Sequence, residues 1–130
     1  MATKIYLGFQ TLVWLGYRLY MIFHPGYLAE IGGVVATTPT GTTEIRAMYG
    51  GLEAGIGLLT LSGILKPDLT RCALLGLLFV VGGLAAGRLF GVLVDGSLST
   101  YTIGALCFEV PSTLLTVFFL RINTKAPSST

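Results

Sequence analysis

The chain has 130 residues, of which 53% are hydrophobic and 11% are charged, and its formal net charge is +2. The apolar share is too high and the charge too low for an ordinary water-soluble domain, so we expect an integral membrane protein. Its scattered Lys and Arg residues form no basic stripe, which argues against nucleic acid as a partner. One His and two Cys supply too few ligands for a metal, haem or iron–sulfur site, so we predict no cofactor and no metal.

Four apolar segments are each long enough to cross a bilayer core of about 30 Å, which takes roughly 20 helical residues. The predicted spans are 5–23, 44–65, 70–94 and 100–120. The first span ends at Pro25-Gly26, and Pro111 is expected to kink the fourth. The connection 24–43 has no pattern strong enough to fold alone, so we expect a partly ordered cap there. The predicted fold is all-α, a single domain over 1–130 that forms an integral membrane four-transmembrane-helix bundle.

The cations outside these spans lie at the amino end, in the middle loop and at the carboxyl end. They are Lys4, Lys66, Arg71, Arg121 and Lys125. Because cytoplasmic loops carry an excess of Lys and Arg, we predict that both termini and the loop 66–71 are cytoplasmic. Cys72 and Cys107 then lie at different depths, beyond the limit of about 7 Å between the Cα atoms of a disulfide. We therefore predict two free thiols.

Several charged and polar side chains fall inside the spans, where each charge costs about 2.5 to 3.5 kcal/mol. The candidates for a binding site or a buried charge network are Arg18, Arg46, Tyr49, Glu53, Arg88, Asp95 and Glu109. Helical spacing places them in the outer half of the membrane, on helix faces that carry other polar residues. These are Gln10 and Trp14 on the first helix, Thr60 on the second, and Thr102, Ser112 and Thr116 on the fourth. We expect Arg88 to pair directly with Glu53 or Glu109.

Two interpretations of this charged layer remain open. In the structural one, interhelical ion pairs fix the register of the helices, because a buried guanidinium must be matched by a carboxylate. In the functional one, Arg18, Arg46 and Arg88 grip an anionic head group or solute, and Glu53 or Glu109 exchanges a proton. No nucleophile has a base that the sequence makes visible, so we predict no catalytic residue and no enzyme activity.

Glycines recur at four-residue spacing on two of the predicted spans. They are Gly51 and Gly55 on the second, and Gly83, Gly87 and Gly91 on the third. This spacing lets membrane helices approach closely, either to pack the second and third helices together or to form an oligomer face. The aromatic residues include candidate anchors at the membrane surface, since amphipathic rings prefer the head-group level. They are Tyr6, Trp14, Tyr17, Tyr20, Tyr27 and Tyr101.

Three stretches together suggest a relationship to a known family: Glu44 to Glu53, with the sequence EIRAMYGGLE; Gly82 to Arg88; and Asp95-Gly96. The chain resembles the domain-of-unknown-function four-three-four-five family of small bacterial membrane proteins. This resemblance implies a four-helix protein of the bacterial cytoplasmic (inner) membrane, and it brings no known activity, substrate or cofactor. The family's polar and glycine positions are matched by Glu44, Arg46, Tyr49, Gly50, Gly51, Gly87, Arg88, Asp95 and Glu109.

Two functions are compatible with these observations. The first is a non-enzymatic accessory or scaffold protein that self-associates or joins a larger membrane complex, because packing and topology explain every visible feature. The alternative is binding or transport of an amphipathic or anionic small molecule or lipid through the arginine and glutamate layer. Expected partners are the lipid bilayer, a second copy or another membrane subunit, and a bound lipid.

Overall fold

The computed structural model describes residues 1–124, which fold into helices with no β-strand among them. They form two compact units, the first over Met1–Pro67 and the second from Asp68 onward. Three of the described helices are long and apolar enough to cross a membrane: Pro39–Leu65, Pro67–Asp95 and Thr100–Asn123. The all-α prediction is confirmed, and these three helices indicate a membrane protein. Lys125, one of the cations behind the predicted orientation, lies outside the described residues.

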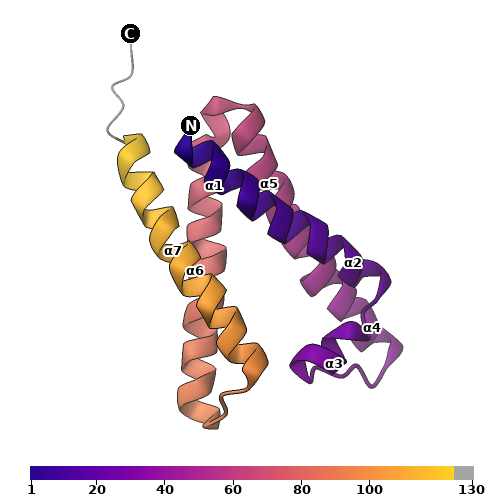
Figure 1. Ribbon diagram of the computed structural model, residues 1–130. Coiled ribbons are helices and arrows are strands. Elements are labelled where there is room, and N and C mark those ends of the chain that lie inside the picture. The colour runs from indigo at the N-terminus through magenta and orange to yellow at the C-terminus, as the bar shows by residue number, and fades with distance from the viewer. Residues whose placement is uncertain (125–130) are drawn as a thin grey trace. The chain divides into compact units, whose positions relative to one another are not determined.

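The first unit is an antiparallel pair of long helices (Figure 1). The first long helix runs through α1 (Ala2–Thr11), a π-helical segment η1 (Leu12–Tyr17) and α2 (Arg18–Phe23). The second returns through α4 (Pro39–Ile45), a second π-helical segment η2 (Arg46–Leu52) and α5 (Glu53–Leu65). A π-helix closes its hydrogen bonds over one more residue than an α-helix does, so each segment widens its helix locally. Segment η1 packs on α5, and η2 packs on α2.

The connection between these two helices is more ordered than the sequence suggests. It contains a short helix α3 (Tyr27–Gly32), which ends at Gly33 in the left-handed conformation, with φ of 69°. The next helix begins at Pro39, not at Glu44, because the Thr38 hydroxyl accepts from the Gly41 amide at 3.1 Å and caps it. Proline at a first helical position needs no amide donor, so this start is favoured. The first turns of this helix are not predicted from the sequence, because Thr and Pro have low helix propensity.

The second unit is a hairpin of two long helices, α6 (Thr70–Asp95) and α7 (Thr100–Thr124), preceded by the 3₁₀ turn η3 (Pro67–Leu69). Gly96 ends α6 with φ of 64°, a conformation that glycine adopts without strain. The two helices lie side by side (Figure 1). The fully buried residues of α6 are small or aliphatic: Ala73, Leu74, Leu77 and Val81. Helix α7 continues through Pro111 to Thr124.

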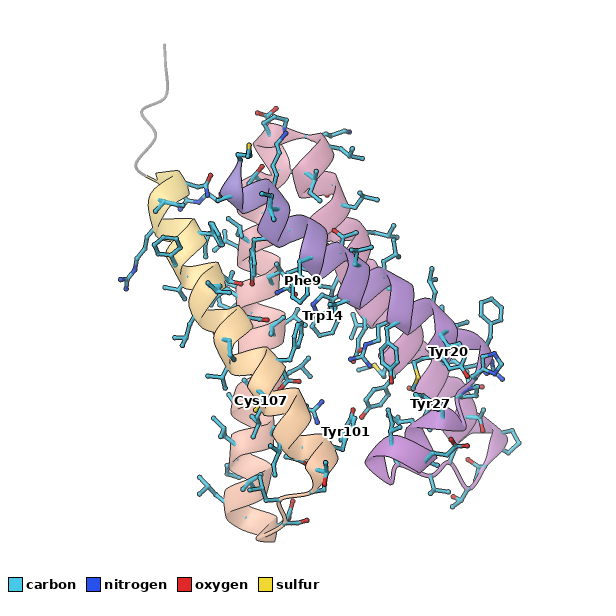
Figure 2. All side chains as sticks on the ribbon, viewed as in Figure 1. Phe9, Trp14, Tyr20, Tyr27, Tyr101 and Cys107 are labelled. Atoms are coloured by element: carbon cyan, nitrogen blue, oxygen red, sulfur yellow. The ribbon has the colours of Figure 1, made fainter. Side chains whose placement is uncertain are left out.

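Both cysteines are free, as the sequence predicts, and both are exposed. Cys72 lies near the start of α6, and Cys107 lies on α7 (Figure 2).

Candidate functional site

The charged residues predicted to form one layer make two separate ion pairs, each inside one unit. In the first unit, Arg18 of α2 pairs with Glu53 of α5, with Nε and Oε2 2.5 Å apart. In the second, Arg88 of α6 pairs with Glu109 of α7. Both pairs link the two helices of one hairpin. The cost of placing each charge in an apolar surrounding is thus offset within its own hairpin.

The Arg18–Glu53 pair lies where both helices leave a π-helical segment. Arg18 directly follows η1, and Glu53 directly follows η2. Both side chains are largely buried, with 15% and 10% of their surface exposed. The guanidinium carbon of Arg18 lies 5.4 Å from the ring centre of Trp14 and 4.9 Å from that of Tyr17. The cation is therefore held by a carboxylate and by the faces of two aromatic rings.

A row of hydrogen bonds continues from this pair along the first helix. Trp14 Nε1 donates to Gln10 Oε1 at 2.9 Å, and Gln10 Nε2 donates to the Tyr6 hydroxyl at 3.0 Å. All three side chains are buried. The four-residue spacing that predicted a Gln10–Trp14–Arg18 stripe thus describes a real polar face. Tyr6 and Trp14, two candidates for anchors at the membrane surface, are buried inside the unit, and each has a polar partner one turn away.

A second contact joins the two helices nearer the middle of the first unit. The hydroxyls of Thr11 and Thr60 lie 2.9 Å apart, and both residues are buried. Each hydroxyl also donates to, or lies in reach of, a carbonyl of its own helix: Leu7 for Thr11 and Gly57 for Thr60. The polar atoms on this face are consequently bonded within the protein.

Arg46, expected in the charged layer, has a different partner. Its Nη1 donates to the backbone carbonyl of Ile22, in the last turn of α2. That turn ends at His24, and Pro25 has no amide hydrogen with which to extend the helical hydrogen bonds. The Arg46 side chain therefore caps the end of the first long helix. Tyr49, one turn away, packs on the apolar cluster of Met21, Leu28 and Ile45.

The Arg88–Glu109 pair has the geometry of a hydrogen-bonded salt bridge. Arg88 Nε donates to both carboxylate oxygens of Glu109, at 2.8 and 3.0 Å. The guanidinium carbon lies 5.3 Å from the centre of the Tyr101 ring, and the Glu109 side chain is only 5% exposed. Of the two carboxylates expected for Arg88, the structure selects Glu109, so the prediction of direct pairing is confirmed. Asp95 is exposed at the end of α6.

The polar face of α7 beyond Glu109 is buried too. Ser112 and Thr116 share this face, and the Thr116 hydroxyl donates to the Ser112 carbonyl at 2.8 Å. Thr102, predicted on the same face, is half-buried, and its hydroxyl lies 3.0 Å from that of Ser99 at the start of the helix. The hydroxyls of Thr102 and Thr116 thus bond to groups of α7 or of the connection just before it.

The glycines in closest helix contact are not those that the four-residue spacing selects. A Cβ atom on Gly57 would lie 2.6 Å from the Leu15 amide nitrogen, and one on Gly50 would lie 2.4 Å from Ile22 Cγ1. Within the described residues, a Cβ on Gly55, Gly83 or Gly87 would meet no atom within 4 Å. One on Gly51 or Gly91 would meet only an atom of its own helix. A seven-residue spacing, from Gly50 to Gly57, would have identified the packing glycines of the first unit.

The five glycines chosen from the sequence therefore do not hold either hairpin together. Their predicted roles, packing of the second helix on the third or association with another molecule, concern contacts outside a single unit and stay predictions. Gly83 and Gly87 are exposed on α6.

No curated protein and no solved structure gives a significant match to this sequence. A family model described as "Domain of unknown function (DUF4345)" matches residues 2–120, nearly the whole chain, and the protein therefore belongs to this family.

Proposed function

We propose that this protein is a non-enzymatic accessory or scaffold subunit of a bacterial inner membrane, one that self-associates or joins a larger membrane complex. The observation that carries the proposal is the pairing of Arg18 with Glu53 and of Arg88 with Glu109, each inside one hairpin. Breaking a buried pair by removing one partner is strongly destabilising, so charges matched in this way serve first to hold helices in register. A hairpin whose buried charges are matched internally is a suitable building block for a membrane assembly.

The rival hypothesis, anion binding by the three arginines, has less support. Each guanidinium already contacts a protein oxygen: Glu53 for Arg18, the Ile22 carbonyl for Arg46, and Glu109 for Arg88. At Arg18 and Arg88 an incoming anion would share a cation that a carboxylate already neutralises, which weakens its attraction to that site. We therefore place the rival second.

We also propose four membrane spans with both ends of the chain in the cytoplasm. The first long helix, Ala2–Phe23, has 22 residues from the start of α1 to the end of α2 and follows α5 and η2 along its length. At about 1.5 Å per residue it reaches roughly 30 Å, enough to cross the apolar core. Within the predicted span 5–23, the strongly polar residues Gln10 and Arg18 have partners inside the unit, which removes the main obstacle to burying this stretch in lipid.

The surface that supports association is the exposed glycine face of α6. Small residues let helices approach closely in a bilayer, where packing and not hydrophobicity drives association. Gly83 and Gly87 are exposed one turn apart and have open space around them within the described residues. Gly104 on α7 is exposed with equally open surroundings, so it provides a matched control on the other helix of the same hairpin.

The test is native mass spectrometry of protein extracted with mild detergent, or in lipid nanodiscs, for the natural chain and for Gly87→Leu and Gly104→Leu. The proposal predicts an oligomer or a copurifying membrane subunit that Gly87→Leu loses and Gly104→Leu retains. A natural chain that is monomeric and partner-free in both preparations would contradict it.

A further inference from the structure

An apolar pocket of about 270 Å³ lies in the cap of the first unit, among residues that neither ion pair uses. Pro25 and Ala29 line it from the start of the cap and from α3. The connection 34–36 lines it from the segment between α3 and α4, and Thr42 and Ile45 line it from α4. Three consecutive pieces of the chain thus line one half-open space.

The chemistry of the lining selects an uncharged aliphatic occupant. Among the lining residues, all of which lie in the described part of the chain, none is charged or aromatic. Thr42 has the only polar side chain, and its hydroxyl already donates to the Thr38 carbonyl at 3.3 Å. An ion would find no counter-charge there, and a planar ring would find no aromatic face to stack on. Methyl and methylene groups match these walls.

The α4 wall and both ends of the 34–36 connection are held in place by neighbouring structure. Gly33 ends α3, and the Thr38 cap starts α4, which sets both ends of the 34–36 connection. Ile45 belongs to the buried cluster with Met21 and Leu28, so the α4 wall is anchored in the core of the unit. A site formed in advance loses little free energy in ordering itself around a ligand.

The rim of the pocket points to the membrane as the source of its occupant. Val35 is 67% exposed and Val34 is 38% exposed, although both belong to a connection. The neighbouring Tyr20 and Tyr27 rings pack edge to face, with centres 5.7 Å apart (Figure 2). Tyrosines are enriched at the head-group level of a bilayer. The connection that carries Val34 and Val35 joins the two long helices of the first unit, so the end of a membrane-spanning hairpin is its expected place. In the proposed membrane arrangement, Val34 and Val35 would lie at the boundary between the head groups and the lipid chains.

We propose that the cap pocket binds part of a single aliphatic chain, supplied by a membrane phospholipid or by a free fatty acid. Its volume is slightly below the range of about 300 to 1,000 Å³ for sites that enclose drug-sized ligands, so one chain segment fits and a whole lipid does not. This proposal goes beyond the scaffold role and depends only on the membrane location of the protein.

The test uses the full chain in detergent and a palmitic acid analogue that carries a photoreactive diazirine on its alkyl chain. Cross-linked positions are mapped by peptide mass spectrometry, with and without excess unlabelled palmitic acid. A parallel sample in phosphatidylglycerol vesicles contains a phospholipid with the same diazirine chain, which distinguishes the two sources. Ala29→Phe fills the pocket, Val35→Ser makes its rim polar, and Ala47→Phe places the same bulk on an exposed position outside the lining.

Labelling within 34–45 that excess palmitic acid reduces, in either sample, supports the pocket. Labelling by the fatty acid in detergent or by the phospholipid in vesicles shows which of the two supplies the chain. Ala29→Phe should lose this labelling and Ala47→Phe should keep it, at similar thermal midpoints. Val35→Ser, at an exposed position where folding is little affected, should weaken labelling by about tenfold, as expected for the loss of one apolar side-chain contact. Labelling that excess palmitic acid does not compete, or that persists undiminished in Val35→Ser, overturns the proposal even if Ala29→Phe fails to fold.

Discussion

Arg18 and Glu53 hold equivalent places in two facing helices: each is the first α-helical residue after a π-helical segment, and their side chains form an ion pair. An α-helix has 3.6 residues per turn, or about 100° per residue. One extra residue in a turn therefore rotates the side chains that follow it by about 100° around the helix axis. The two wide segments therefore set the direction in which both charged side chains point. Arg88 and Glu109, by contrast, lie within the α-helices α6 and α7.

The packing of the first unit predicts different outcomes for two neighbouring glycines. Gly57→Ala should lower stability by about 1 to 3 kcal/mol, because the new methyl group would overlap the Leu15 backbone, which cannot move aside cheaply. Gly55→Ala, two residues earlier on α5, has open space and should be neutral or stabilising by up to about 1 kcal/mol. Thermal midpoints in one detergent measure both. Equal effects of the two substitutions would mean that the close contact at Gly57 is wrong.

The cap on the first long helix predicts a role for Arg46 that is independent of ligand. Arg46→Met should lose about 1 to 3 kcal/mol, because the Ile22 carbonyl loses a charged hydrogen-bond donor. Arg71→Met removes an exposed arginine at the start of α6 and should change stability by less than about 0.5 kcal/mol. Thermal unfolding should show no stabilisation by added phosphate in either variant or in the natural chain. Stabilisation by phosphate that disappears in Arg46→Met would favour the anion-binding hypothesis.

The proposed orientation predicts which loops a membrane-impermeant thiol reagent can reach. In a chain carrying Cys72→Ser and Cys107→Ser, a cysteine at Ser97 should react in intact cells. A cysteine at Asp68, in the exposed turn between the two units, should react only after the cells are opened. The physical reason is the excess of Lys and Arg beside the second site. The reverse pattern would invert the topology, and reaction of both sites in intact cells would contradict the number of spans.

The sequence predicts the long helices well because apolar length and helix-breaking pairs are local signals. The predicted helix over 70–94 ends within one residue of the end of α6. The first helical residues of α4, 39–43, lie outside the predicted span 44–65, because Thr and Pro lower helix propensity and the start depends on the Thr38 cap. The π-helical segments have no sequence signature. They follow from the packing of one long helix on the other, which the amino-acid sequence alone does not show.

The candidate site was predictable in part for the same reason. The free energy of burying an unpaired charge in a membrane is high, so a direct partner for Arg88 was predictable from the sequence. The choice of Glu109 over Glu53 depends on which helices form a hairpin, and the sequence does not show this. The role of Arg46 depends on an unsatisfied carbonyl at Ile22, a backbone feature that side-chain spacing does not show. The glycines that pack the first unit, Gly50 and Gly57, fall outside the four-residue motif, because that motif does not show which face of a helix meets its partner.

The central claim is that the membrane-buried charges hold each hairpin together, and double-mutant cycles on stability test it most directly. The variants are Arg88→Ala, Glu109→Gln and Glu53→Gln, with Arg88→Ala combined with each glutamine in turn. Arg88→Ala should cost about 3 to 5 kcal/mol, because it leaves the Glu109 carboxylate buried without its cation. The Arg88–Glu109 cycle should show a coupling of about 0.5 to 3 kcal/mol, and the Arg88–Glu53 cycle should be additive within about 0.5 kcal/mol.

The decisive number is the coupling energy of Arg88 with Glu109, measured from unfolding midpoints of the detergent-solubilised protein. A clear coupling in this cycle, beside additivity with Glu53, is the result that intrahairpin pairing predicts. Additive losses in the Arg88–Glu109 cycle would show that the two side chains do not stabilise each other, and the structural role of the charges would then be wrong.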